Sequence, residues 1–395
     1  MSILHSDKQK KRSANYISAK EMRAISRQNR RITSEIEKRR NRKNVPESEY
    51  VTAMQDPANV VEFDNLHTYF FTDIGTVKAV DGVTFAIPQG KTVGVVGESG
   101  CGKSVTSLSL MQLVQRPQGQ IVEGAIRLNL GDKAVDIAKM PTEAMQKIRG
   151  KAVSMIFQEP MTSLNPVFRI GMQLDEVISL HNPEMSKDAV KARSIDMLEK
   201  VGIANSNGVY AMFPHELSGG MRQRVMIAMA LACDPKLIIA DEPTTALDVT
   251  IQAQILELMQ ELKNKLNTSI IMITHDLGVI ASMCSRIVVM YGGCVAETGT
   301  VREIFYEPRH PYTWGLLRSI PKAQARDAHT KLVPIPGTPP DMLRPPKGCP
   351  FAPRCRYAMQ VCREYMAPET VLSDTHRVAC HLMHKNAPSV TREDV

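Results

Sequence analysis

The chain has 395 residues, of which 43% are hydrophobic and 23% charged, and its formal net charge is +8. This length predicts two or three domains and a large buried core. We find no run of about 18 apolar residues, and no compact apolar segment behind the N-terminal charges, so we expect neither a membrane-spanning helix nor a secretory signal. A cytosolic protein is the resulting expectation.

The positive charge is concentrated at the N-terminus. Residues 1–45 contain 14 Lys or Arg and 4 acidic residues, a balance of +10, which leaves a balance of −2 for the remainder. The body is therefore not expected to bind nucleic acid. Residues 1–58 form a basic extension and linker with few apolar side chains, which favours a solvated, partly helical tail. Contact with anionic lipid or with RNA is the alternative for this tail.

The next segments predict an α/β fold. Residues 60–70 and 77–87 are expected to pair as antiparallel strands with Gly75 between them. The insertion at 160–217 is mainly helical, most clearly at 187–201, within a helical subdomain at about 160–230. Five β-rich runs alternate with helical patterns and predict a parallel sheet covered on both faces. These runs are residues 92–96, 152–157, 236–240, 269–273 and 286–291.

A phosphate-binding loop follows the first of these strands. Residues 97–104 read G-x-x-x-x-G-K-S, between a β-branched run and a helical pattern. In this context the glycines let backbone N–H groups face phosphate oxygens at a helix N-terminus. Lys103 is predicted to bind the β- and γ-phosphates and Ser104 to bind Mg²⁺. The other predicted nucleotide contacts here are Gly97, Ser99, Gly100, Cys101, Gly102 and Val105.

Two carboxylates follow another apolar strand. Asp241 and Glu242 stand where open α/β sheets bind ligands, at the C-terminal end of a strand. We expect Asp241 to serve Mg²⁺ and Glu242 to act as the base that polarises the attacking water. Taken alone, such a pair is also typical of a helix N-cap.

Two further side chains end strands at the same predicted edge. His275 follows residues 269–274 and could donate to the γ-phosphate, while the Gln158 amide could reach Mg²⁺ or water. A structural histidine and a polar loop residue are the alternatives. The joint occurrence of all these groups at one edge favours a catalytic site.

A second glycine-rich helix start lies at Ser218, Gly219 and Gly220. It offers a second anion site, because backbone N–H groups at a helix N-terminus point at an anionic ligand. If both sites bound one nucleotide within a subunit, the roughly 115 residues between them would have to fold the two together. The simpler arrangement places each site against the nucleotide of a partner subunit.

Together these residues resemble the ATP-binding subunits of ABC transporters over about residues 60–320, so the expected fold is a P-loop NTPase of the ABC type at 59–320. The resemblance implies that Gly97–Ser104 is the Walker A motif, Gln158 the Q-loop, 217–221 the signature, 237–241 the Walker B motif and His275 the switch histidine. It further implies ATP and Mg²⁺ as cofactors, with Ser104, Gln158 and Asp241 around the metal.

The resemblance also implies a head-to-tail dimer around two ATP molecules. Ser218 and Gly220 would contact the γ-phosphate held by the opposite subunit, and Asp248 would belong to the D-loop. An upstream aromatic residue stacks on adenine in this family. Phe70 fits best, although Tyr69 and Phe71 leave the choice open. Met221 stands where many signatures of this family have glutamine. It lies after Ser218 and the glycines that are expected to bind phosphate, so we expect little loss of function.

Several segments resemble the dipeptide and oligopeptide importer ATPases in particular. These are 157–161, 163–166, the signature with its following Arg-Gln-Arg, and His310-Pro-Tyr-Thr313. The resemblance implies a peripheral subunit at the cytoplasmic face of the membrane, a paralogous second ATPase subunit, two permeases and, indirectly, an extracytoplasmic binding protein. Import of nickel or another solute is the alternative cargo. A soluble ABC ATPase acting on nucleic acid or ribosomes is the alternative class.

The C-terminal extension, residues 321–395, is rich in proline and contains four cysteines at 349, 355, 362 and 380. Their spacings do not fit the short knuckles of zinc sites. Four thiolates on a proline-rich loop suit a [4Fe–4S] cluster, and the extension resembles family members that carry one. We therefore expect Cys349, Cys355, Cys362 and Cys380 to bind a structural cluster, with unligated buried thiols as the alternative. A regulatory iron–sulfur module that uses ATP as a signal is a third function class.

Overall fold

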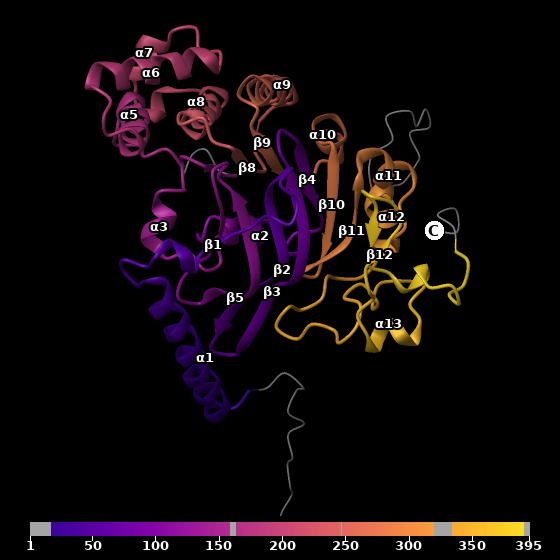
Figure 1. Ribbon diagram of the computed structural model, residues 1–395. Coiled ribbons are helices and arrows are strands. Elements are labelled where there is room, and N and C mark those ends of the chain that lie inside the picture. Colours follow the sequence, from indigo (N-terminus) through magenta and orange to yellow (C-terminus); the bar gives the residue numbers. More distant parts are fainter. Residues whose placement is uncertain (1–16, 159–162, 246, 320–333, 391–395) are drawn as a thin grey trace, which may run out of the picture.

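The computed structural model describes residues 17–158, 163–245, 247–319 and 334–390, and it contains two β-sheets with helices around them (Figure 1). The predicted fold class, an α/β nucleotide-binding domain with an antiparallel β subdomain and a helical subdomain, is confirmed. Within these ranges, no helix combines the length and apolar character that crossing a bilayer requires.

The first sheet is the predicted antiparallel subdomain. Its order is β1-β6-β5-β2-β3, and its long central hairpin joins β2 to β3. The β2 and β3 ends meet at Thr72 and Gly75, as the turn residues predict. The strands are β1 (Val51–Thr52), β2 (Asn59–Thr72), β3 (Gly75–Pro88), β5 (Gly119–Asn129) and β6 (Ala134–Asp136).

The main sheet has the order β12-β13-β11-β10-β4-β9-β8-β7. Its last five strands, from β10 to the edge strand β7, are parallel, and they coincide within one or two residues with the five β-rich runs of the sequence. They are β4 (Thr92–Val96), β7 (Val153–Ile156), β8 (Leu237–Asp241), β9 (Ser269–Ile273) and β10 (Arg286–Tyr291). The antiparallel strands are β11 (Cys294–Thr300), β12 (Thr370–Val371) and β13 (Arg377–Val378).

Alternate residues of the parallel strands pack into two different cores. Ile238 and Ile270 belong to the cluster under the helices, whereas Ile239 and Ile271 belong to the cluster that faces the antiparallel sheet. Successive side chains of a strand point to opposite faces, so a strand covered on both sides must be apolar throughout. Because both faces of these strands are buried, polar side chains are placed at the ends of the strands.

Helices α5 to α8 form the group seen above one end of the main sheet in Figure 1. Their shared core includes Leu174, Met197, Val209 and Val225. They are α5 (Ile170–His181), α6 (Lys187–Lys200), α7 (Ser206–Ala211) and α8 (Gly219–Leu231). The others associated with the ATPase body are α2 (Lys103–Leu110), α3 (Thr142–Gln146), α9 (Val249–Leu266), α10 (Leu277–Met283), α11 (Val301–Tyr306) and α12 (Pro311–Arg318). Short 3₁₀ helices occur at Glu47–Glu49, Pro214–Glu216 and His381–Met383.

The basic N-terminal segment contains a helix, α1 (Ala19–Arg40), which begins at a Ser18–Glu21 capping box. It contacts the antiparallel sheet through polar groups: Asn29 donates to the Thr72 carbonyl at 2.7 Å, and Glu37 accepts from Gln120 at 2.7 Å. The helix is therefore docked on the sheet rather than wholly solvated. Residues 1–16 of the tail lie outside the described residues.

The C-terminal extension adds to the main sheet. Residues 334–350 contain neither helix nor strand, as the prolines predict. Beyond them come α13 (Gln360–Glu364) and the β12–β13 hairpin, and β13 pairs with β11 through Glu297 and Thr298. This pairing is not predictable from the sequence, because a two-residue strand has no detectable periodicity.

Candidate active site

The phosphate-binding loop connects the buried strand β4 to α2. Gly97 and Gly102 are required by their surroundings. A Cβ on Gly97 would lie 2.2 Å from the Met290 carbonyl oxygen, and one on Gly102 2.4 Å from that of Ala79. Gly102 has φ +102° and is the N-cap of α2, a conformation that glycine adopts without strain. The loop is thus pressed against β10 and β3 from behind.

The loop brings the predicted lysine and serine together with the first carboxylate. Lys103 Nζ donates to the Gly97 and Glu98 carbonyl oxygens at 2.8 and 3.0 Å. Ser104 Oγ donates to Asp241 Oδ1 at 3.2 Å, across 137 residues of sequence. A hydroxyl and a carboxylate oxygen at this separation are a donor set that suits Mg²⁺. Asp241 is almost fully buried, and this burial raises its pKa despite the Ser104 hydrogen bond.

The remaining loop residues line the same turn. Ser99 and Gly100 are exposed, whereas Cys101 is buried, and Val105 packs from α2 against the core facing the antiparallel sheet. Burial raises the pKa of the Cys101 thiol. The exposed residues leave backbone N–H groups accessible to a phosphate ligand.

Glu242 sits just beyond β8 in a left-handed conformation, with φ +48°. Such a backbone is uncommon for a residue with a side chain, and it turns the carboxylate away from the line of the strand. The Glu242 N–H donates to the Ile273 carbonyl at 2.8 Å, which fixes it to the neighbouring strand β9. The backbone conformation of Glu242 and its hydrogen bond to β9 therefore hold this residue at the sheet edge.

Three donors surround the Glu242 carboxylate. Gln158 Nε2 lies 2.9 Å from Oε2, Thr245 Oγ1 lies 2.9 Å from the same oxygen, and His275 Nδ1 lies 3.1 Å from Oε1. Burial alone raises the pKa of Glu242, but the hydrogen bonds from His275 and Thr245 outweigh it and the pKa is lowered. The carboxylate is thus kept ionised, which a general base requires.

Gln158, Glu242 and His275 were singled out in the sequence, and the structure brings them together. Thr245 was missed. A hydroxyl three residues after a carboxylate is the available signal, since it can fold back on that carboxylate in a turn.

The signature segment belongs to the helical group. Ser218 is the N-cap of α8 and accepts from the Met221 N–H at 3.3 Å. Ser218 and Gly219 are exposed, and Gly220 is partly exposed. Asp248, in turn, is the exposed N-cap of α9 and accepts from the Ile251 N–H at 2.9 Å. Both positions are open to a second molecule. Ala246, next to this segment, lies outside the described residues.

The three candidate adenine-stacking residues differ in their surroundings. Phe71 is buried, and the Tyr69 hydroxyl donates to Asp81 at 2.6 Å. Phe70 is partly exposed on β2, beside Gly119 of β5. Phe70 stays the predicted stacking residue.

The prediction of an iron–sulfur cluster at Cys349, Cys355, Cys362 and Cys380 is wrong. In the part of the chain that the structure describes, no group of three or more His, Cys, Asp or Glu side chains is placed to hold a metal, and these four thiols are free. Burial raises the pKa of Cys349, that of Cys355 to about 11 and that of Cys380 to about 12. Burial therefore favours the neutral thiol form of these three side chains.

The fold and this site define an ATP-binding cassette. Residues 80–245 match the ABC transporter family, and residues 296–362 match the oligopeptide/dipeptide transporter C-terminal region. A dimeric ATP-binding cassette solved in a post-hydrolysis state with ADP and phosphate superposes with a TM-score of 0.54. It is 25% identical and covers 61% of this chain and 99% of its own.

Two curated relatives are similar over most of the chain. The oligopeptide transport ATP-binding protein OppD of Bacillus subtilis (strain 168) is 52% identical over 84% of this chain and 91% of its own. The dipeptide transport ATP-binding protein DppD of the same strain is 50% identical over 83% of this chain and 96% of its own. The chain therefore belongs to the ABC transporter ATP-binding proteins of the oligopeptide and dipeptide type.

Proposed function

We propose that the chain is the ATP-hydrolysing subunit of an importer for dipeptides and oligopeptides. The observation that carries this proposal is the convergence of Ser104, Asp241 and Glu242 at one sheet edge. The family match in the C-terminal region supports peptide cargo, because the most similar relatives reported above are oligopeptide and dipeptide transport proteins. Neither carries a name that favours the nickel alternative.

The loop residues are proposed to bind the triphosphate. Gly97, Ser99, Gly100, Cys101 and Gly102 would offer backbone N–H groups. Lys103 would exchange its contacts with the Gly97 and Glu98 carbonyls for the β- and γ-phosphates. Val105 and Phe70 would complete the nucleotide site. Ser104, Gln158 and Asp241 would hold Mg²⁺, which when bound neutralises phosphate charge.

Glu242 is proposed as the base for hydrolysis. Its ionised carboxylate would orient a water molecule toward the γ-phosphorus and accept a proton from it as the new P–O bond forms and ADP leaves. Gln158 and His275 already contact this carboxylate, so they are placed to orient the same water or to contact the γ-phosphate. Thr245 would help to keep Glu242 ionised.

The exposed second anion site supports a partner subunit. Ser218, Gly219 and Gly220 would contact the γ-phosphate held by the other ATPase subunit, which we propose is a paralogue, and Asp248 would lie at the same interface. ATP binding would close this pair, and hydrolysis would open it.

The helical group is proposed to receive the permeases at the cytoplasmic face of the membrane. Four apolar side chains on α5 and in the segment just before it are 45–71% exposed. They are Val167, Phe168, Met172 and Leu180. The segment that directly follows Gln158, residues 159–162, lies outside the described residues.

The test is peptide uptake by cells that lack this chain. Returning the wild-type gene should restore uptake of a labelled dipeptide and a labelled tripeptide, whereas Lys103→Ala should not, because it removes the phosphate-binding cation. Accumulation of ⁶³Ni²⁺ serves as the control and should not change. Peptide uptake that is independent of the gene, or a gene-dependent change in nickel alone, would contradict the proposal.

A further inference from the structure

The C-terminal extension contacts the phosphate-binding loop directly through one arginine. Arg354 lies 256 residues after Glu98, the second residue of the loop. Both terminal nitrogens of its guanidinium nevertheless donate hydrogen bonds to the Glu98 carboxylate. The distances are 2.6 Å from Nη1 to Oε2 and 3.1 Å from Nη2 to Oε1. The arginine side chain is 6% exposed and the glutamate side chain 24%. This bidentate pair is therefore largely shielded from solvent, unlike a surface ion pair.

All five N–H donors of Arg354 are used. Besides the two bonds to Glu98, Nη1 donates to the Tyr291 hydroxyl at 3.0 Å. Nη2 donates to the Ile335 carbonyl at 3.1 Å, and Nε donates to the Pro336 carbonyl at 2.8 Å. A guanidinium has five donors in a fixed planar fork, so this set leaves it no freedom to rotate away. Arg354 thus ties the loop to β10 and to the proline-rich segment at once.

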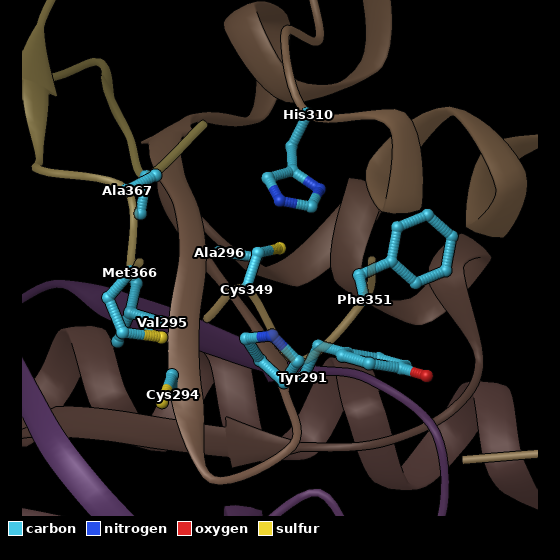
Figure 2. Close-up of a pocket in the computed structure, with 11 residues that line it drawn as sticks. Tyr291, Cys294, Val295, Ala296, His310, Cys349, Phe351, Met366 and Ala367 are labelled. Atoms are coloured by element: carbon cyan, nitrogen blue, oxygen red, sulfur yellow. The ribbon is translucent and has the colours of Figure 1, made fainter. Parts of the chain in front are cut away.

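The main chain of the same loop residue is also held. The Glu98 N–H donates to the Tyr312 hydroxyl of α12 at 2.8 Å. Tyr312 is fully buried against Tyr291 and Phe351, with ring centroids 4.5 and 5.4 Å away. Tyr291, His310 and Phe351, labelled in Figure 2, help to line a cavity of about 20 Å³, close to the volume that one water molecule needs. The Glu98 main chain is therefore bonded to a residue of a buried aromatic cluster.

The loop is held from behind at its glycine as well. A Cβ on Gly97 would clash with the Met290 carbonyl oxygen. The Gly293 N–H donates to the Cys101 carbonyl at 3.1 Å. β10 and the turn after it therefore hold the backbone of the loop at Gly97 and Cys101, while Arg354 and Tyr312 hold Glu98. In a loop that binds anions through aligned N–H groups, such a constraint determines whether those groups converge.

Charge gives the contact a second consequence. Glu98 places a carboxylate in a loop predicted to bind a triphosphate, and an unpaired carboxylate there would repel the ligand. Pairing with Arg354 neutralises the Glu98 carboxylate. All five donors of Arg354 are occupied in these contacts, so the arginine itself is not a phosphate-binding group.

We propose that Arg354 is a positioning residue for the phosphate-binding loop, through which the C-terminal extension sets the affinity for ATP. This inference rests on the proposed function only in that the loop binds ATP. Arg354 does not contact the nucleotide; it acts through Glu98, with Tyr312 holding the same residue by its main chain.

The experiment compares purified Arg354→Ala, Arg354→Lys and Glu98→Gln variants with wild type, each in complex with its transporter partners. The matched control is Arg363→Ala, another arginine of the extension, which is exposed. We measure KM and kcat for ATP hydrolysis, the Kd for MgADP and the thermal midpoint without nucleotide. Removing Arg354 should raise KM and Kd roughly tenfold or more, with kcat at saturating ATP changed much less. The lysine variant should recover only part of this loss, because a single ammonium cannot reproduce the planar fork.

The outcomes separate positioning from a purely structural role. If Arg354→Ala lowers the thermal midpoint but leaves KM and Kd within twofold of wild type, Arg354 only stabilises the fold and the inference is overturned. If Arg354→Ala does not fold, Glu98→Gln decides the question, since it keeps the side-chain volume and tests the same contact. An effect of Arg363→Ala equal to that of Arg354→Ala would also overturn the inference. A wild-type complex that neither binds nor hydrolyses ATP would instead refute the proposed function.

Discussion

Replacing Glu297 with glutamine tests how the C-terminal extension is attached to the ATPase body. Glu297 lies on β11 and is fully buried. Its carboxylate accepts from the Arg309 N–H at 2.7 Å, the His310 N–H at 3.0 Å and His376 Nε2 at 2.8 Å. One side chain thus joins the main sheet, the turn before α12 and the extension.

The expected cost follows from these contacts. Hydrogen bonds to a charged group contribute about 1.5–3 kcal/mol each. Glutamine has one acceptor oxygen, and its NH₂ group would face an N–H donor, so at least one donor is left buried and unpaired. Breaking such a buried set costs about 3–5 kcal/mol. At about 2–4 °C per kcal/mol for a domain of this size, the thermal midpoint should fall by roughly 6–20 °C.

The assay is thermal unfolding of the purified chain followed by calorimetry, with Glu369→Gln as the matched control. Glu369 pairs with Arg377 at 3.1 Å in the same extension, but both side chains are more than 40% exposed. An exposed pair contributes about 0–1 kcal/mol, so the control should shift the midpoint by no more than about 4 °C. If Glu297→Gln and Glu369→Gln behave alike, the extension is not attached as described.

Two further predictions concern the loop and the catalytic carboxylate. Gly102→Ala should weaken MgATP binding far more than Gly100→Ala, because both glycines have positive φ but only a Cβ at 102 meets a backbone oxygen, at 2.4 Å. Titration of MgATP by calorimetry measures this, and equal losses would refute the steric argument. Thr245→Val should raise the pKa of Glu242, since the Thr245 hydrogen bond is one of the contacts that lower it. The acid-side fall of kcat should then move to higher pH than in wild type, and an unchanged pH profile would show that Thr245 does not act on Glu242.

Local features of the site were predictable from the sequence because adjacent residues create them. The loop at 97–104 follows its strand directly, and its glycines, Lys103 and Ser104 are read in one stretch. Strands β8 and β9 are mostly apolar runs, so Glu242 and His275, which follow them closely, could be placed at the sheet edge. The common edge then follows from the parallel arrangement.

Features that depend on long-range contacts were not predictable. β13 has two residues and gains its place by pairing with β11. Arg354 reads as a charged residue in an irregular segment, and its five hydrogen bonds reach three separate stretches of chain. The four cysteines show the reverse error, since their clustering in sequence suggested a cluster ligand set that the described residues do not form. Spacing alone does not fix how side chains are oriented.

The measurement that tests the central claim most directly is ATP turnover by the Glu242→Gln variant, with ATP binding measured on the same sample. The contacts of Gln158, Thr245 and His275 with this carboxylate predict that binding is retained while kcat falls at least about a hundredfold, since a positioned general base contributes roughly 10²–10⁴-fold. Undiminished hydrolysis by Glu242→Gln would contradict the assignment of this carboxylate as the base.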